Sequence, residues 1–133
     1  MIDIAAIESA ARRLAGVSVR TPLLQNFELD AAAGGKVLVK PECLQVTGSF
    51  KIRGAYNFLS QLSSEQARSG VVAFSSGNHA QGVAAAGRML GIRTTIVMPE
   101  DAPRAKLENT RRLGGEVITY DRYTGDRLSL IHI

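Results

Sequence analysis

The sequence has little cysteine, little histidine and few aromatic residues. Its 133 residues include one cysteine, Cys43, and two histidines, which excludes a disulfide framework and a zinc-ligand cluster. No apolar run approaches the roughly 18 residues that a membrane-spanning helix needs. The first residues also lack the basic start and apolar core of a secretory signal. We therefore expect a reduced, cytoplasmic compartment without membrane association, and we interpret Cys43 as a packing residue.

Positive charge is in excess but is not concentrated. The chain carries 16 Lys and Arg against 12 Asp and Glu, a net charge of +4, and its isoelectric point is near 9.6. The densest basic stretch, residues 104–112, is interrupted by Glu108, and no aromatic residues are interleaved with it. Stacking platforms for nucleic acid need such aromatic residues. The pattern favours a solvated helix face, is compatible with binding small anions, and predicts no nucleic-acid partner.

The spacing of apolar residues predicts helices and strands in alternation. Helical spacing occurs in residues 3–14, 48–59 and 103–113, and residues 79–90 are alanine-rich and helical. Ser63 and Gln66 are spaced as in a capping box, which predicts a short helix over residues 63–68. Strand-like runs occur in residues 36–40, 71–75, 94–98 and 116–120. Strands joined by helices through short links predict an α/β fold with a parallel sheet and flanking helices. The continuous apolar run 71–75 predicts a strand buried on both faces.

The last residues do not follow this alternation. A further helix is expected to begin near Asp126 and Arg127, but the chain continues into the apolar tail LSLIHI, residues 128–133. We interpret this tail as a reading-frame or sequencing artefact. The alternative is a terminal strand added to the edge of a sheet.

Two loops are placed where parallel sheets bind ligands, which is at the carboxyl ends of strands. Residues 47–51 precede one helix, and Lys51 at its start lies beside Phe50. Partial burial and the helix dipole are expected to lower the pKa of this amine, which could then form a Schiff base; the alternative is a surface lysine whose stem packs on Phe50. Residues 75–79 begin another helix, whose free N–H groups favour an anion such as a carboxylate. The alternative there is a simple helix cap. Asn78 would meet Lys51 at the same rim.

Three motifs carry a resemblance to a known family. They are LVKPECLQVTGSFKIRGAYNFL (38–59), SSGNHAQGVA (75–84) and IVMPEDAPRAKLENTRRLGGEV (96–117). In this order and spacing the sequence resembles the serine/threonine dehydratases, pyridoxal-phosphate enzymes of fold type II that share the fold of the tryptophan synthase β chain. Serine racemases and hydroxyaspartate dehydratases have nearly the same motifs.

The resemblance implies roles for the residues of the two loops. Lys51 would hold pyridoxal 5′-phosphate as a Schiff base and then take the substrate α-proton, with Phe50 beside the cofactor ring. Asn78 would hydrogen-bond the ring 3-hydroxyl, and Ser76 matches the opposite-face acid/base of racemases. The loop that would grip the substrate carboxylate consists of Ser75, Ser76, Gly77, Asn78 and His79. We expect His79 to shape this loop and not to act as an acid or base. Thr47 and Gln81 match positions that contact a nucleotide effector in some racemases.

The implied reaction eliminates water from a small hydroxy-amino acid and then hydrolyses the product to a 2-oxo acid and ammonia, giving 2-oxobutanoate from L-threonine or pyruvate from L-serine. Relatives are more than twice this length, form homo-oligomers and carry their glycine-rich phosphate loop downstream. Residues 1–45 would then pack on a large domain beyond this chain, and residues 46–127 would form most of a small α/β domain. The isolated chain is accordingly expected to be an inactive module that at most binds small anions.

Overall fold

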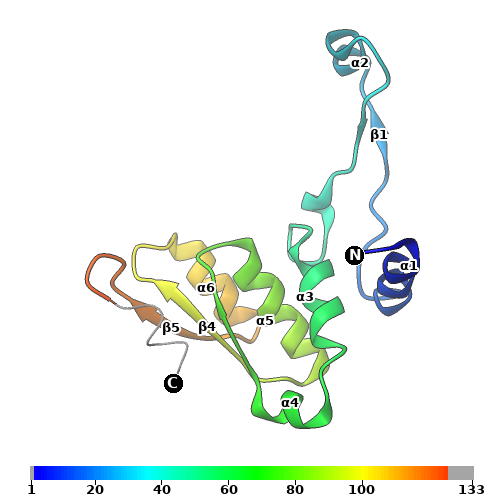
Figure 1. Ribbon diagram of the computed structural model, residues 1–133. Coiled ribbons are helices and arrows are strands. Elements are labelled where there is room, and N and C mark those ends of the chain that lie inside the picture. The colour runs from blue at the N-terminus through cyan, green and yellow to red at the C-terminus, as the bar shows by residue number, and fades with distance from the viewer. Residues whose placement is uncertain (1, 126–133) are drawn as a thin grey trace.

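The computed structural model describes residues 2–125, and its amino-terminal part extends away from the rest (Figure 1). This N-terminal segment, residues 2–45, comprises α1 (Ile4–Arg13), β1 (Leu24–Gln25), α2 (Phe27–Ala33), β2 (Leu38–Val39) and the 3₁₀ turn η1 (Glu42–Leu44). Asp3 caps α1 by accepting a hydrogen bond from the N–H of Ala6, and Asn26 caps α2 in the same way. The helix predicted for residues 3–14 is therefore confirmed as α1, whereas α2 was not predicted.

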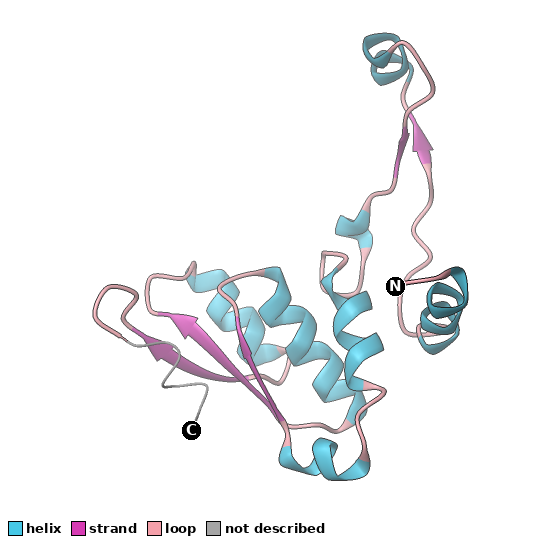
Figure 2. Ribbon diagram, in the orientation of Figure 1, coloured by secondary structure: helices cyan, strands magenta, loops and turns pink. Residues whose placement is uncertain are grey.

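The strand predicted at residues 36–40 lies outside the parallel sheet. Only its two central residues form β2, and they pair antiparallel with β1, so that Leu24 faces Val39 and Gln25 faces Leu38. The two-stranded ribbon stands apart from the other strands (Figure 2). The expectation that Lys51 follows a strand of the parallel sheet is therefore wrong.

The second half of the chain forms the predicted parallel sheet. Its strands are β3 (Val71–Phe74), β4 (Thr94–Pro99) and β5 (Glu116–Tyr120), hydrogen-bonded in the order β3-β4-β5. Helix α5 (Asn78–Leu90) connects the first pair and α6 (Arg104–Arg112) the second. Both crossover helices pack on the sheet and against each other, as Figure 1 shows. The α/β class with parallel strands is confirmed.

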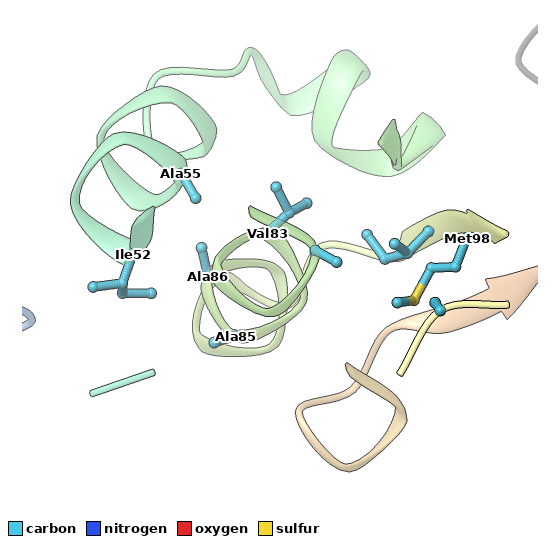
Figure 3. Packing of buried hydrophobic residues seen from close by; sticks show 9 residues of the cluster. Ile52, Ala55, Val83, Ala85, Ala86 and Met98 are labelled. Atoms are coloured by element: carbon cyan, nitrogen blue, oxygen red, sulfur yellow. The ribbon is translucent and has the colours of Figure 1, made fainter. Parts of the chain in front are cut away.

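Helix α5 lies at the centre of the hydrophobic core. Ile52 and Ala55 of α3 (Lys51–Leu59) lie on one side of it, and Met98 of β4 lies on the other (Figure 3). Apart from Gln81, its buried residues are small: Ala80, Gly82, Val83, Ala84, Ala85, Ala86 and Gly87. Small side chains let a helix approach two neighbours at once at normal packing density. This explains why an alanine-rich stretch occupies the most enclosed position in the fold.

One face of the sheet remains partly open in the described residues. Ala73, Ile96 and Val117 are aligned across the three strands and pack into the core beneath α5. On the opposite face, Val72 is 50% exposed and Ile118 is 39% exposed. The prediction that residues 71–75 are buried on both faces is therefore wrong, because β3 is an edge strand of this sheet and both crossover helices cover the other face.

A short helix, α4 (Ser64–Ser69), connects α3 to β3. The capping box predicted from Ser63 and Gln66 is present, because each side chain hydrogen-bonds the other residue's backbone N–H. None of the helices in residues 2–125 is long and apolar enough to cross a membrane. The expectations for the tail 128–133 and for a helix near residue 126 lie outside the described residues.

The N-terminal segment buries no apolar residue. Its only buried residues are polar, Thr21 and Gln45, while Phe27 is 84% exposed. Cys43 is also exposed, so its interpretation as a packing residue is wrong within the described chain. A segment with so little apolar burial has a small hydrophobic contribution to its own stability. The division of the chain into residues 1–45 and 46–127 remains a prediction.

Candidate active site

The chain reaches Lys51 through a tight turn. Gly48 has a φ of +69°, a left-handed conformation that favours glycine, and its N–H donates to the carbonyl of Gln45 at 2.8 Å. Helix α3 then begins at Lys51, with Phe50 as its N-cap residue. The Lys51 Nζ lies 4.8 Å from the centroid of the Phe50 ring. The lysine is thus both at a helix start and against an aromatic face, as the sequence suggested.

A pocket lies beside this lysine. It has a volume of about 230 Å³ and is lined by Phe50, Lys51, Gly54, Ala55 and His79. An adjoining apolar pocket of about 170 Å³ shares Gly54, Ala55 and His79 and extends along α3 to β3. The lysine amine therefore borders a hollow with small, apolar walls. A planar organic ring could pack against such walls.

His79 brings a second nitrogen base to this pocket. Burial lowers the pKa of His79, and the positive charge of Lys51 lowers it further. Both effects disfavour the imidazolium, since burial removes water from the charged form and a neighbouring cation repels it. His79 is therefore neutral at neutral pH.

The distance between α3 and α5 is set by Gly82. A Cβ placed on Gly82 would lie 3.0 Å from the carbonyl carbon of Lys51 and 3.2 Å from the N of Ile52. Backbone atoms at the start of α3 therefore occupy the space where a side chain would be. This close approach, and not a strand of the parallel sheet, carries Lys51 to the amino-terminal end of α5.

The N–H groups of Ser75 and Gly77 in the loop before α5 are hydrogen-bonded, whereas the first N–H groups of α5 itself have no side-chain cap. The N–H of Gly77 donates to Ser75 Oγ at 3.2 Å, and the N–H of Ser75 donates to the carbonyl of Val97 at 3.2 Å. Gly77 has a negative φ, and a Cβ built on it meets no atom within 4 Å. Helix α5 has no side-chain cap and no acidic residue in its first turn. Its first N–H groups can therefore receive an anion.

Asn78, the first residue of α5, contacts the next crossover helix. The Nζ of Lys106 in α6 donates to Asn78 Oδ1 at 2.7 Å. The sequence predicted that Asn78 meets Lys51 at a common rim, and it gave no sign of Lys106. The rim at this helix end thus includes Lys51, Lys106 and the neutral His79.

A polar clamp connects α3 to the N-terminal segment. Arg53 donates from Nε to Glu42 Oε2 at 2.7 Å and from Nη2 to Glu42 Oε1 at 3.0 Å. It also donates to Ser18 Oγ and to the carbonyl of Val19, while Thr21 Oγ1 donates to Glu42. The hydrogen bonds from Arg53 hold the pKa of Glu42 at about 2, against an ordinary value of 4.5. Arg53 stands two residues after Lys51, so the clamp fixes the first turn of α3.

Several buried polar atoms near the start of α3 have no hydrogen-bond partner among the described residues. They are Thr47 Oγ1, Ser49 Oγ and, in α5, Gln81 Nε2. A buried polar group without a partner costs about 1–3 kcal/mol. Such groups are expected to receive a partner from outside residues 2–125.

The structure brings together part of the predicted site. Phe50, Lys51 and His79 share one pocket, and Asn78 adjoins His79 at the start of α5. Ser75, Ser76 and Gly77 lie in the loop immediately before, in the predicted order. The residues missed from the sequence are the pocket walls Gly54 and Ala55, together with Gly82, Lys106 and Glu42, which is the ion-pair partner of Arg53. Among residues 2–125, no three His, Cys, Asp or Glu side chains are arranged to hold a metal ion.

Comparisons with known proteins extend this geometry. Residues 15–132 match the family described as pyridoxal-phosphate dependent enzyme. The chain is 56% identical over 118 residues to an L-threo-3-hydroxyaspartate ammonia-lyase of a Pseudomonas species, covering 89% of this chain and 37% of that protein. It is 52% identical over 118 residues to an L-threonine ammonia-lyase of Thermotoga maritima, covering 89% of this chain and 29% of that protein.

The fold is shared with solved structures as well. A structure of maize serine racemase matches with a TM-score of 0.91 and 42% sequence identity, covering 98% of this chain and 40% of that chain. The chain therefore spans about two fifths or less of the length of these relatives. The expected family, fold type and cofactor, pyridoxal 5′-phosphate, are confirmed. This chain belongs to the pyridoxal-phosphate-dependent enzymes of fold type II, the family of the threonine ammonia-lyases, serine racemases and hydroxyaspartate ammonia-lyases.

Proposed function

We propose that the full-length protein containing this sequence is an ammonia-lyase acting on L-threonine or L-serine. Water is eliminated first, and hydrolysis of the resulting enamine then takes up one water and releases ammonia, so that ammonia is the net loss and 2-oxobutanoate or pyruvate is the product. The observation that carries the proposal is the placement of Lys51 on an apolar pocket beside a neutral histidine, next to an uncapped helix start. The lysine on the apolar pocket suits a cofactor aldehyde, and the uncapped helix start suits a substrate carboxylate.

The described residues form one side of the site, and that side fits the cofactor. Phe50, Gly54 and Ala55 offer apolar walls for a pyridine ring, and Lys51 offers the amine. The unpartnered Ser49 Oγ and Thr47 Oγ1 nearby offer polar groups that a ligand or later residues could satisfy. Pyridoxal phosphate, when bound, supplies an electron sink for the negative charge left at Cα after proton removal.

The roles of the residues follow from their positions. The amine of Lys51 would hold the cofactor and then take the α-proton of the substrate, for which it must be uncharged. The neutral state of His79 avoids a positive charge close to this amine. The N–H groups at the start of α5, with Ser75, Ser76 and Gly77, would hold the carboxylate and so orient the substrate for proton removal. Asn78 would donate a hydrogen bond to the ring oxygen of the cofactor.

The test is a measurement of products in the purified full-length protein supplied with pyridoxal 5′-phosphate. We expect ammonia and the matching 2-oxo acid in equal amounts from L-threonine or L-serine. The variant Lys51→Ala should lose the visible absorbance of covalently held cofactor and at least about 1,000-fold in rate, since it removes the reacting amine. Turnover that persists in Lys51→Ala would contradict the proposal.

A second candidate activity is the deamination of 3-hydroxyaspartate. The 56% identity to an L-threo-3-hydroxyaspartate ammonia-lyase favours it, and the ammonium of Lys106 beside the start of α5 suits a substrate with two carboxylates. Comparing kcat/KM for L-threonine, L-serine and L-threo-3-hydroxyaspartate distinguishes the two activities. Racemisation of serine is the remaining alternative, in which Ser76 would return the proton on the opposite face. Chiral analysis of serine after incubation tests it.

We also propose that the full-length protein is a homo-oligomer and that the 133-residue chain alone is inactive. The exposed apolar side chains of the N-terminal segment support the need for a covering surface, because a segment that buries only polar residues lacks a core of its own. Size-exclusion chromatography with light scattering tests the first statement. The product assay on the isolated chain tests the second.

A further inference from the structure

We propose that Lys106 is a positioning residue that fixes the side-chain amide of Asn78 with its nitrogen free to donate toward the cofactor. This inference rests on the proposed function, because it assigns how one residue of that site is oriented. Its basis is a single contact between the two crossover helices, in which Lys106 Nζ lies 2.7 Å from the side chain of Asn78.

The chemistry of the contact determines which way the amide faces. A lysine ammonium can donate hydrogen bonds but cannot accept them, whereas an asparagine amide has an accepting oxygen and a donating nitrogen. The atom that meets Lys106 must therefore be the oxygen, Oδ1. The NH₂ group is then directed away from Lys106 and keeps both of its hydrogens. Without Lys106, this exposed amide could rotate by half a turn at little cost.

The position of Lys106 in its helix supports a role beyond helix stability. Lys106 lies in the first turn of α6, a turn that has no acidic residue. Cations are unfavourable there because the helix dipole is positive at this end. The turn is nevertheless firmly held, since Thr110, which is fully buried, donates from Oγ1 to the Lys106 carbonyl at 2.8 Å. The contact with Asn78 offsets the unfavourable placement of the charge.

The direction of the amide matters for an anionic ligand. Asn78 immediately precedes His79, which lines the pocket of Lys51. An amide nitrogen donates to an oxygen that carries negative charge, whereas an amide oxygen in the same place would repel it. Lys106 would therefore contribute to cofactor affinity through Asn78 and without touching the cofactor.

The test measures the affinity of the full-length protein for pyridoxal 5′-phosphate by titration of its visible absorbance, in Lys106→Met, Asn78→Ala and the double variant. We expect Lys106→Met to weaken binding by about 3- to 10-fold, the effect of one hydrogen bond. In the Asn78→Ala background the same change should have less than about a 2-fold effect, since the group through which it acts is absent. Lys106→Arg keeps a donor and should restore affinity to within about 2-fold.

A matched control removes one positive charge from the same helix. Arg111→Met changes an exposed residue at the far end of α6 and should leave cofactor affinity unchanged. A Lys106→Met loss that persists in Asn78→Ala, or that Arg111→Met reproduces, would overturn the inference, because it would reflect net charge alone. Unchanged affinity in Lys106→Met would overturn it too.

A second measurement does not require the cofactor. In full-length protein with ¹⁵N-labelled asparagine, the side-chain NH₂ resonances of Asn78 should shift in Lys106→Met and return in Lys106→Arg. Identical resonances in all three proteins would overturn the inference while leaving the proposed activity intact. If the wild-type protein takes up no pyridoxal phosphate, the proposed function fails and this inference fails with it.

Discussion

The ion pair between Glu42 and Arg53 is expected to stabilise the start of α3 far more than an ordinary surface ion pair would. The pKa of Glu42 gives an upper limit: its fall from 4.5 to about 2 corresponds to about 3 kcal/mol without screening, and this includes the hydrogen bonds from Arg53 as well as those from Thr21 and Gln45. The Glu42 side chain is 18% exposed and that of Arg53 is 29% exposed. Screening by this solvent contact reduces the expected contribution to about 1–2 kcal/mol.

The same chain offers a matched control. Arg104 and Glu108 form an ion pair of 2.6 Å on the surface of α6, where their side chains are 90% and 57% exposed. An exposed pair four residues apart on a helix contributes about 0.3–0.5 kcal/mol. A double-mutant cycle with Glu42→Gln and Arg53→Met should therefore give a coupling energy at least twice that of the cycle with Glu108→Gln and Arg104→Met.

Amide hydrogen exchange in the full-length protein is the suitable assay, because it reports local opening without requiring two-state unfolding of a large protein. The readout is protection of residues 51–59 and of residues 18–21, which the clamp joins. Equal coupling energies in the two cycles, or a coupling energy below about 0.5 kcal/mol for Glu42 and Arg53, would refute the reasoning.

The pH dependence provides a further check. Glu42 has a lowered pKa in the folded chain, so the unfolded chain binds a proton first as the pH falls. The stabilisation is complete above pH 4.5 and is lost progressively as the pH falls toward about 2. The difference in protection between wild type and Glu42→Gln should narrow over this range. A difference in protection that stays constant down to a pH of about 2 would show that the stabilisation does not arise from the charge of Glu42.

Four further outcomes follow from the packing, the helix cap and the electrostatics. Gly82→Ala should destabilise the protein by about 1–3 kcal/mol and weaken cofactor uptake, because its Cβ would lie 3.1 Å from the Lys51 carbonyl oxygen. At Gly54 an added Cβ meets no atom within 4 Å, so Gly54→Ala should stabilise α3 by about 0.5–1 kcal/mol. Thermal unfolding measures the change in stability of each variant. Ser63→Ala removes the capping box and should cost about 1 kcal/mol, measured as faster amide exchange in α4. Burial and Lys51 lower the pKa of His79 in the folded chain, so wild type should lose stability relative to His79→Gln as the pH falls below 6.5, measured by unfolding at several pH values.

Local patterns predicted the regular elements of the second half well. The capping box at Ser63 and the apolar runs of β3, β4 and β5 are short-range signals, and the structure contains each of them. The pattern at residues 36–40 gave a wrong prediction of a strand in the parallel sheet, because a β-branched run does not specify which strand it pairs with. Only Leu38–Val39 forms a strand there. Helix α2 was missed although Asn26 caps it, since an isolated Asn is also a common turn residue.

The same distinction between short-range signals and long-range contacts applies to the candidate site. Phe50 and Lys51 are adjacent in sequence, and so are the loop residues 75–79, so motifs could identify them. The contact from Lys106 to Asn78 and the clamp from Arg53 to Glu42 join residues that are 28 and 11 positions apart. Nothing in the spacing of charged residues distinguishes these partners from other charges on the surface. Only the packing of the helices identifies them.

Helix α5 connects these separate features, which gives its small residues a functional meaning. Its first residues provide Asn78 and His79 to the site, and Gly82 sets the distance to Lys51. The same helix packs on β4 and α6, so its position is fixed from both sides. A larger residue at Gly82 would therefore displace Lys51 relative to His79 and not merely strain the core. The alanine-rich composition of this helix, which reads as generic helix propensity in sequence, is a requirement of the site geometry.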